Sequence, residues 1–414
     1  MVTGRTILAW YIALALSTPI AAAQVAPPVR TLTSLGATDS GVVTRVAGIR
    51  ILRGGEVLIS DGGRRRVILL DSTLSQTTVV VANDSGFANK YGNGLPGLIP
   101  YLADSTVFPS QETQSLLVID PTGNVIRAMA PPKAGRDFGF LLSGLTGPGG
   151  QPAFDPAGRL VYRGSRQATQ ARRPDGAPDS GTRSVSFGPD SAPIMRGDLD
   201  TRIVDTIGMV RLAVSKGVTI ALGRGRETSY GLYNPIRSVD EWALLPDGTI
   251  ALVRGQDYHI DWVSPDGKKS STPKMPFDWK RLALEDKQKL LDSARQSVAE
   301  VRAKQVAAGQ QVSSTPFVTV EPDEIPDYYP PVRTGQVKAS PDGNLWILPS
   351  TSSLSTAAQP GLVYDVINRR GEVFERVRLP EGRNLLAIGP SGVVYMSYAP
   401  SQGQLRLERA KILR

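Results

Sequence analysis

The stretch SPDGNLWIL, residues 340–348, joins a tight turn to an apolar strand, and this pattern recurs along the chain. It returns as RGGEVLIS at 53–60, DPAGRLVY at 155–162, LPDGTIALV at 245–253 and GPSGVVYM at 389–396. Pro and Gly supply fixed or positive φ angles, and the β-rich run after each glycine is typical of a hairpin. We therefore expect a β-hairpin at each of these places.

A second set of turns follows most of the first. It reads DPTGNVI at 120–126, SPDGKK at 264–269 and RRGEVF at 369–374. Two hairpins per unit predict four strands per unit.

The spacing of the first turns predicts the architecture. Their intervals are 49, 54, 90, 95 and 49 residues, counted between Gly55, Asp104, Gly158, Gly248, Gly343 and Gly392. A basal period of about 50 residues is typical of a β-propeller blade, and the two long intervals would hold insertions. A pair of β-sandwiches is the alternative, although it does not require the same turn and strand order to recur. The segments RIVDTIGMV at 202–210 and VTIALG at 218–223 leave a seventh blade open.

The two ends of the chain predict how the ring closes. The last unit offers three strands before the chain stops, whereas VRTLTSLG at 29–36 precedes the first unit without a partner. Pairing this strand with the last unit satisfies both backbone edges. The expected fold is an all-β, six-bladed propeller of four-stranded blades, with the N-terminal strand completing the last blade.

The long connections are expected to gather on one face of the ring. They span 82–98, 131–150, 164–191, 213–238 and 272–336, whereas the short turns belong to the opposite face. Within 278–309, Leu290, Ala294, Val298 and Val301 predict one inserted amphipathic helix that ends at Gly309. Long loops on a rigid scaffold commonly carry function, so this face is the expected site.

The first 23 residues predict a cleavable secretory signal peptide. Arg5 precedes an apolar run of about ten residues, which is too short to span a membrane, and the segment ends at Ala23, the expected cut. Residues 24–414 would form a single propeller domain in a secreted or periplasmic, monomeric protein without a membrane span. The net charge of +9 is scattered, which favours a solvated basic surface and no nucleic-acid partner.

With these turns, strands and closing strand, the chain resembles exported six-bladed propellers of the NHL and TolB-like kind. The segment DEWALLPDGTIALVRGQDYHIDWVSPDG at 240–267, followed by PFDWKRLALEDKQKLL from residue 276, also resembles uncharacterised bacterial propellers. The resemblance implies the fold and transfers no catalytic residue.

Few catalytic chemistries are open to the sequence. It has no cysteine and one histidine, which excludes thiolate sites and multi-histidine metal sites. His259 alternates with apolar neighbours and is expected on a half-exposed strand; a general base paired to Asp257 or Asp261 is the alternative. A calcium site is the other alternative, with ligands drawn from Asp240, Glu241, Asp137, Asp323 and Asp327.

The richest mixture of aromatic, cationic and acidic side chains lies between the third and fourth units. We expect the binding site to include Arg226, Tyr230, Tyr233, Arg237, Asp240 and Glu241. Replacing Arg237, Tyr233 or Asp240 by Ala should weaken binding while changing stability little. The preferred function is a non-enzymatic binding or scaffolding module for a protein, peptide or glycan, with no catalytic residue and no cofactor. The alternatives are a calcium-dependent hydrolase or lactonase and an envelope assembly or quality-control factor.

Overall fold

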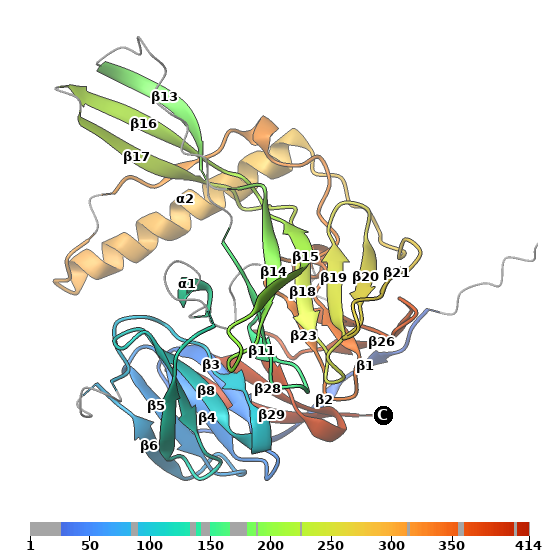
Figure 1. Cartoon of the computed structure of the whole chain (residues 1–414). Coiled ribbons are helices and arrows are strands. Elements are labelled where there is room, and N and C mark those ends of the chain that lie inside the picture. Colours follow the sequence, from blue (N-terminus) through green and yellow to red (C-terminus); the bar gives the residue numbers. More distant parts are fainter. Residues whose placement is uncertain are drawn as a thin grey trace, which may run out of the picture.

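The computed structural model describes residues 26–83, 90–132, 138–141, 150–165, 180–187, 189–223, 226–312, 315–354, 360–400 and 404–413. This part of the chain is almost entirely β, as predicted, with one long helix (Figure 1). The predicted signal peptide and Asp137 lie outside the described residues. No helix in the described ranges has the length and apolar character needed to cross a membrane.

Six sheets follow one another through the described chain, each with four antiparallel strands, and the fifth has β1 (Val29–Arg30) as an additional parallel strand. The first contains β3 (Val46–Ile51), β4 (Val57–Asp61), β5 (Arg66–Leu70) and β6 (Thr77–Val81); the second contains β7 (Ile99–Pro100), β8 (Thr106–Ser110), β9 (Ser115–Ile119) and β10 (Val125–Met129). The third contains β11 (Ala153–Phe154), β12 (Leu160–Arg163), β14 (Ser191–Gly197) and β15 (Val204–Arg211); the fourth contains β18 (Glu241–Leu244), β19 (Ile250–Arg254), β20 (His259–Val263) and β21 (Lys269–Ser271). The fifth contains β23 (Val337–Ala339), β24 (Leu345–Ile347), β25 (Val363–Ile367) and β26 (Val373–Arg378); the sixth contains β27 (Asn384–Ile388), β28 (Val393–Tyr398), β29 (Arg406–Ile412) and β2 (Leu32–Ala37). The four-stranded unit predicted from paired turns is therefore confirmed.

The turn between the first two strands of every sheet adopts the conformation that the sequence predicted. All six marker residues have positive φ, from 60° at Asp104 to 94° at Gly55. In the turn of the fifth sheet, the N–H of Gly343 donates to the carbonyl of Ser340 at 3.0 Å, and the N–H of Ser340 donates to the carbonyl of Asn344 at 2.9 Å. These bonds describe a type I turn followed by a left-handed residue, which favours glycine.

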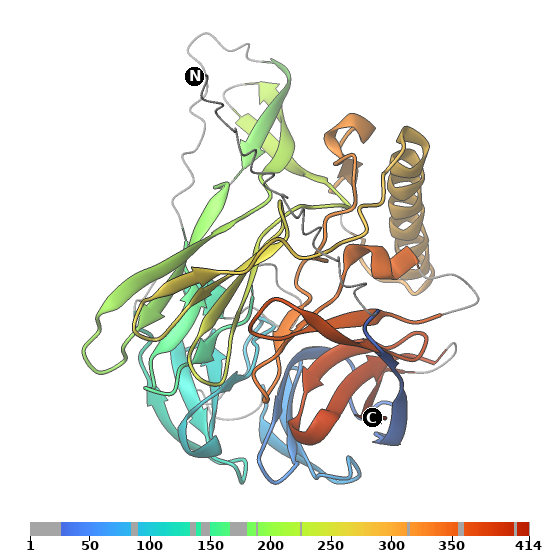
Figure 2. The ribbon, with the colours of Figure 1, turned by 90° about the vertical axis from the view of Figure 1, so that its right-hand side faces the viewer.

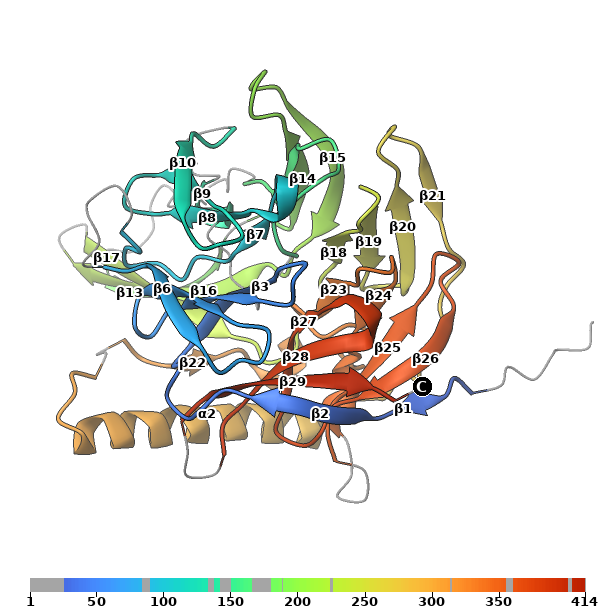
Figure 3. The same cartoon turned by 90° about the horizontal axis from the view of Figure 1, so that it is seen from below.

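Both faces of each sheet are apolar, and six buried clusters join the sheets into a ring. On β4, Leu58 packs toward the second sheet while its neighbours Val57 and Ile59 pack toward the sixth. The other clusters join the second sheet to the third, the third to the fourth, the fourth to the fifth and the fifth to the sixth. The packing thus closes on itself, as the view from below shows (Figure 3).

The N-terminal strand completes the sixth sheet, as predicted from its lack of a local partner. β2 pairs antiparallel with β29, with Leu32 opposite Ile412 and Ala37 opposite Glu408. The preceding strand β1 (Val29–Arg30) pairs in parallel with β26 of the fifth sheet. The first described residues therefore bridge two neighbouring sheets.

The long connections contain regular structure that the sequence analysis missed. β13 (Ser180–Phe187), β16 (Ser215–Gly223), β17 (Arg226–Tyr233) and β22 (Val318–Thr319) form an inserted sheet, in the order β13, β16, β17, β22. The segment 202–210 lies mostly in β15 of the third sheet, whereas 218–223 lies in β16 of the inserted sheet. The expectation of irregular crossovers at 213–238 was therefore wrong, because distant strands supply the missing backbone partners.

One helix was predicted within 278–309, and α2 spans Leu284–Ala307. Glu285 and Asp286 lie in its first turn, and Gly309, with φ of 67°, follows its end. Its predicted apolar stripe is only partly buried: Leu290, Ala294 and Val298 are half-buried and Val301 is 54% exposed. The fully buried apolar residue is Leu291, which lies outside that stripe. Short turns of helix complete the described elements: α1 (Phe138–Leu141), η2 (Leu102–Asp104), η3 (Pro322–Glu324), η4 (Ser350–Leu354) and η5 (Pro390–Gly392).

All the insertions extend from the same face of the ring. In an antiparallel sheet, the connection from the second to the third strand and the connection to the next sheet lie at one end, so we call this end the looped face and the other the turn face. β13 lies in the connection from the second to the third strand of the third sheet. β16 and β17 lie in the connection from the third sheet to the fourth, and α2 and β22 lie in the connection from the fourth sheet to the fifth. Figures 1 and 2 show the inserted sheet and α2 on one side of the ring.

Deletion of residues 29–37 should open the ring at its sixth sheet. The backbone of β29 would lose its ladder partners, each worth about 0.5–1.5 kcal/mol, so we expect a loss of about 3 kcal/mol or more and aggregation through the open edge. Thermal unfolding and light scattering measure both effects. Leu35→Ser is the matched control, because Leu35 lies on β2 with 44% of its side chain exposed. A deletion variant with the melting temperature of the intact protein would contradict the closure.

Candidate functional site

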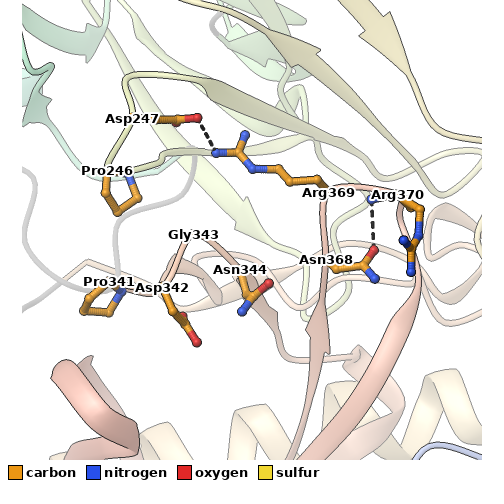
Figure 4. Close-up of a pocket in the computed structure, with 9 residues that line it drawn as sticks. All are labelled: Pro246, Asp247, Pro341, Asp342, Gly343, Asn344, Asn368, Arg369 and Arg370. Atoms are coloured by element: carbon orange, nitrogen blue, oxygen red, sulfur yellow. Dashed lines mark hydrogen bonds and ion pairs between the residues drawn. The ribbon is translucent and has the colours of Figure 1, made fainter.

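One pocket, of about 500 Å³, lies on the turn face between the fourth and fifth sheets (Figure 4). Its polar groups are already bonded within or between turns. The Arg369 guanidinium donates to Asp247 at 2.8 Å and lies 5.1 Å from the ring of Trp262. The side-chain amide oxygen of Asn368 accepts the backbone N–H of Arg370 at 2.9 Å. The Ser340 hydroxyl donates to Asp342. This pocket is therefore explained by the packing of short turns.

A second pocket, of about 250 Å³, lies on the same face between the second and third sheets. Here Arg202 donates to the carbonyls of Ala130 and Pro131, and Asp198 accepts the N–H groups of Asp200 and Thr201. These polar groups also stabilise the turns that carry them. In both pockets, therefore, most polar side chains already form hydrogen bonds or ion pairs within the turns, and few are left to contact a ligand.

Four of the six residues expected in the binding site belong to the inserted region. Arg226, Tyr230 and Tyr233 lie on β17, and Arg237 follows it on an exposed segment. The Tyr233 side chain is 40% exposed, and its ring lies 5.3 Å from the ring of Phe317. Strand β17 and the segment after it belong to the looped face, on which the binding site is predicted.

Asp240 has a structural environment that the sequence did not predict. Its carboxylate accepts the Arg254 guanidinium at 2.8 Å and the N–H groups of Gly255 and Arg211, each at 3.0 Å. The side chain is buried between the third and fourth sheets. The expectation that its replacement would barely change stability is therefore wrong, because these donors would lose a buried acceptor.

Glu241 is even less exposed, at 1%, and connects three sheets. One carboxylate oxygen accepts the N–H of Gly335 at 2.7 Å, just before β23, and the other accepts the N–H of Gly150 at 3.2 Å, just before β11. Gly150 packs tightly on Trp242, since an added Cβ would lie 2.4 Å from the indole nitrogen. Glu241 therefore holds the starts of the third and fifth sheets against the fourth.

Two cationic side chains lie within electrostatic range of Glu241. Lys338 is on β23, the innermost strand of the fifth sheet, and Arg163 is the last residue of β12 in the third sheet. Burial lowers the pKa of the Lys338 ammonium to about 8, against the opposing effect of Glu241. Burial also lowers the pKa of the Arg163 guanidinium, again opposed by Glu241. We call Arg163, Glu241 and Lys338 the central charge cluster.

The other carboxylates considered for calcium are dispersed. Asp327 pairs with the Lys287 ammonium at 2.7 Å beside α2, and Asp323 is exposed in η3. Among the described residues, no three His, Asp or Glu side chains are grouped so that they could hold a metal.

His259 lies on β20, as its alternating neighbours predicted, with 22% of its side chain exposed. Its ring nitrogens lie 3.0 Å from Asp257 and 3.3 Å from Asp261. Asp261 in turn accepts the Arg254 guanidinium at 2.8 Å and the Ser271 hydroxyl at 2.5 Å. His259 thus extends the ion-pair network around Asp240 toward the outer part of the fourth sheet.

Lys338 and Arg163 were not among the residues selected from the sequence. The signal was present, however, because VKASPDG places Lys338 two residues before a turn motif and hence on an innermost strand. Arg163 ends the strand LVYR in the same way, after the turn at Gly158. A charged residue on an inner strand is unusual enough to mark a position of interest.

No protein-family model matches the chain, and no curated protein matches it. Among solved structures, the PQQ-bound aldose sugar dehydrogenase of Streptomyces coelicolor aligns with 13% identity and a TM-score of 0.42 over 94% of this chain and all of that one. A putative gluconolactonase aligns with 14% identity and a TM-score of 0.39 over 92% and 96%. A catalytically inactive virginiamycin B lyase of Staphylococcus aureus, solved with quinupristin, aligns with 10% identity and a TM-score of 0.38 over 92% and 99%. These neighbours are propeller-like proteins, and at these scores they assign no activity to this chain.

Asp240→Ala should destabilise the protein by about 3 kcal/mol, because it leaves a partly buried guanidinium and two backbone N–H groups without their acceptor. Arg237→Ala is the control and should stay within about 0.5 kcal/mol, since Arg237 is exposed. Denaturant unfolding of both variants measures the difference. Equal stability of the two would contradict the structural role of Asp240.

Lys338→Met should stabilise the protein at pH 7 by about 1–3 kcal/mol. The pKa of Lys338 is about 8 when folded and 10.5 in its ordinary state, so folding at neutral pH carries the cost of a desolvated charge. That cost is fully present below pH 8 and is lost as the pH rises through 10.5. The gain from Lys338→Met should therefore shrink over this window, as measured by unfolding at several pH values.

Lys268→Met provides the control for that titration, because Lys268 is exposed and pairs with Asp266 at 2.9 Å. It should give no gain in stability at any pH. A gain from Lys338→Met that is independent of pH would contradict the assignment, since it would reflect better packing alone.

Proposed function

We propose that the protein is an extracytoplasmic binding module, a six-bladed β-propeller that holds its ligand on the looped face. The closed series of six apolar clusters and the pairing of β2 with β29 support the blade count. In this proposal residues 1–23 direct export, and residues 24–414 form one domain.

The observation that carries the proposal is the folded platform on the looped face, which consists of the inserted sheet, α2 and the segment 318–329. Its parts come from three connections that are distant in sequence, yet they bond to one another. β13 pairs with β16, β17 pairs with β22, and Lys216 of β16 forms an ion pair with Glu324 of η3. Connections that served only to link sheets would not need such contacts.

The platform has its own small core and a partly apolar surface. Leu282, Leu291, Val320, Ile325 and Tyr329 form the core, with Leu232 of β17 packed against it. Exposed apolar or aromatic side chains surround this core: Val214, Tyr233, Leu284, Val301, Val306 and Tyr328 are 40–67% exposed. A raised surface with aromatic and cationic side chains suits a protein, peptide or glycan ligand.

The proposal is tested by screening residues 24–414 against glycan and peptide arrays and then measuring variants on the bound probe. Tyr233→Ala and Arg237→Ala should each weaken binding by about 5- to 30-fold while leaving the melting temperature unchanged. Arg370→Ala is the control, because Arg370 is exposed on the turn face and pairs with Glu372 at 2.6 Å. Loss of binding in the Arg370→Ala control alone would place the site on the turn face and contradict the proposal.

Calcium distinguishes this proposal from the hydrolase or lactonase alternative. The alternative needs a stoichiometric calcium ion, so its protein should melt at a lower temperature in chelator than in calcium. For the proposed binding module, the melting temperature should be the same in chelator and in calcium.

A further inference from the structure

We propose that a short two-stranded ribbon on the looped face binds an acidic saccharide, that is, a sugar chain with carboxylate groups. The ribbon consists of residues 279–282 and 327–329, both from the connection between the fourth and fifth sheets. The inference names a ligand class for the proposed function, and it rests on that function only in assigning the ligand to the looped face.

Backbone contacts hold the two halves of the ribbon side by side, although α2 lies between them in the sequence. The N–H of Leu282 donates to the carbonyl of Asp327 at 2.8 Å. One step away, Arg281 and Tyr328 form an antiparallel bridge. Two residues that are opposite each other in this way share one side of the ribbon, with Cβ atoms about 4.5–5.5 Å apart.

The ribbon has a buried side and an exposed side. Leu282 and Tyr329 are 2% and 8% exposed and belong to the core of the platform. Neighbouring residues on an extended chain point to opposite sides, so Arg281 and Tyr328 point away from this core. Trp279 precedes Arg281 by two positions and therefore shares its side. The exposed fractions agree, since Trp279 is 45% and Tyr328 is 47% exposed.

Trp279 differs from the other tryptophans of the described ranges, which are buried: Trp242, Trp262 and Trp346. Its indole is nevertheless held in place. The ring packs edge-on against Phe277 with centroids 5.1 Å apart, and Phe277 packs in the same way against the buried Tyr258 at 5.9 Å. An aromatic ring that is both ordered and exposed offers a ligand a fixed apolar surface at low entropic cost.

The charge on the exposed side is positive. Residues 274–281 contain three exposed cationic side chains and one carboxylate. The carboxylate on the other half of the ribbon, Asp327, is already paired with the Lys287 ammonium at 2.7 Å. Arg281, in contrast, forms no hydrogen bond or ion pair within the described chain. Its guanidinium donors are therefore available to an anionic group from solution.

An acidic saccharide is complementary to this combination of rings and charge. The C–H groups of a sugar ring can pack on the electron-rich face of an indole or phenol ring while its hydroxyl groups stay in water. A carboxylate on the same sugar chain would accept two hydrogen bonds from the planar guanidinium of Arg281. An acidic peptide suits the ribbon less well, because peptide anchors commonly fill pockets and both pockets described above lie on the turn face.

The test measures binding of tetragalacturonate, an oligosaccharide of uronic acids, to residues 24–414 by isothermal titration calorimetry. Neutral maltotetraose at the same ionic strength should bind at least about tenfold more weakly, because it lacks the carboxylates that Arg281 would bind. Tetragalacturonate should also protect the tryptophan fluorescence from quenching by acrylamide, since Trp279 is the exposed indole of the described chain. This second measurement needs no variant.

Trp279→Ala and Arg281→Gln should each weaken the binding of tetragalacturonate by about tenfold, the first by removing the stacking surface and the second by removing the charged donors. Phe374→Ala and Arg370→Gln are the matched controls. Phe374 lies on β26 with 39% of its side chain exposed, and Arg370 is exposed on the turn face. Both control variants should bind as the unmodified protein does.

Three results would overturn the saccharide site: no binding of tetragalacturonate, equal binding of the two saccharides, or binding that survives both ribbon substitutions. Tighter binding of tetraglutamate than of tetragalacturonate would also overturn it, because the ribbon would then select an acidic peptide. These results are distinct from failure of the proposed function, which Tyr233→Ala and Arg237→Ala test on the probe that the arrays identify.

Discussion

The structure depends on one packing constraint, which is that every ring sheet is apolar on both faces. A strand such as VLISD at 57–61 sends alternate side chains into two different buried clusters, so its sheet needs a neighbour on each side. An open stack would leave one apolar face exposed at each end. The ring removes both ends, and the pairing of β2 with β29 supplies the fourth strand of the last sheet.

This constraint divides the molecule into two unequal faces. On the turn face, short connections use their own side chains to stabilise the turn, as Asp155 does by accepting the N–H groups of Ala157 and Arg159. Lengthening such a turn would break these bonds. The connections on the looped face are not held to a short length by such bonds. Three of them contain strands or a helix, and these elements pack together. The ring thus supplies a rigid base on which the looped face can change without loss of the core.

The sequence predicted those features that depend on local chemistry. Turn residues with positive φ, the strands after them and the unpaired strand at 29–36 all follow from short-range patterns. The inserted sheet could not be predicted in this way, because β13 pairs with β16 between residues that are 28 to 42 positions apart, and GRGRETSYG at 223–231 resembles a flexible connection. In the candidate site, Tyr233 and Arg237 are exposed on the looped face, as the sequence suggested. The burial of Asp240 and Glu241 depends instead on partners such as Arg254, Gly335 and Gly150. Such tertiary hydrogen bonds leave no local pattern in the sequence.

Glu241 links the stability of the ring to the chemistry of its centre. The alternative interpretation of this carboxylate was a calcium ligand, but its two oxygens accept backbone N–H groups from Gly150 and Gly335. These bonds hold the starts of the third and fifth sheets against the fourth. The burial that brings the three sheets together also lowers the pKa values of Lys338 and Arg163, and the nearby charge of Glu241 opposes that effect. The ring therefore needs the carboxylate both for its geometry and to offset the cost of the cations buried beside it.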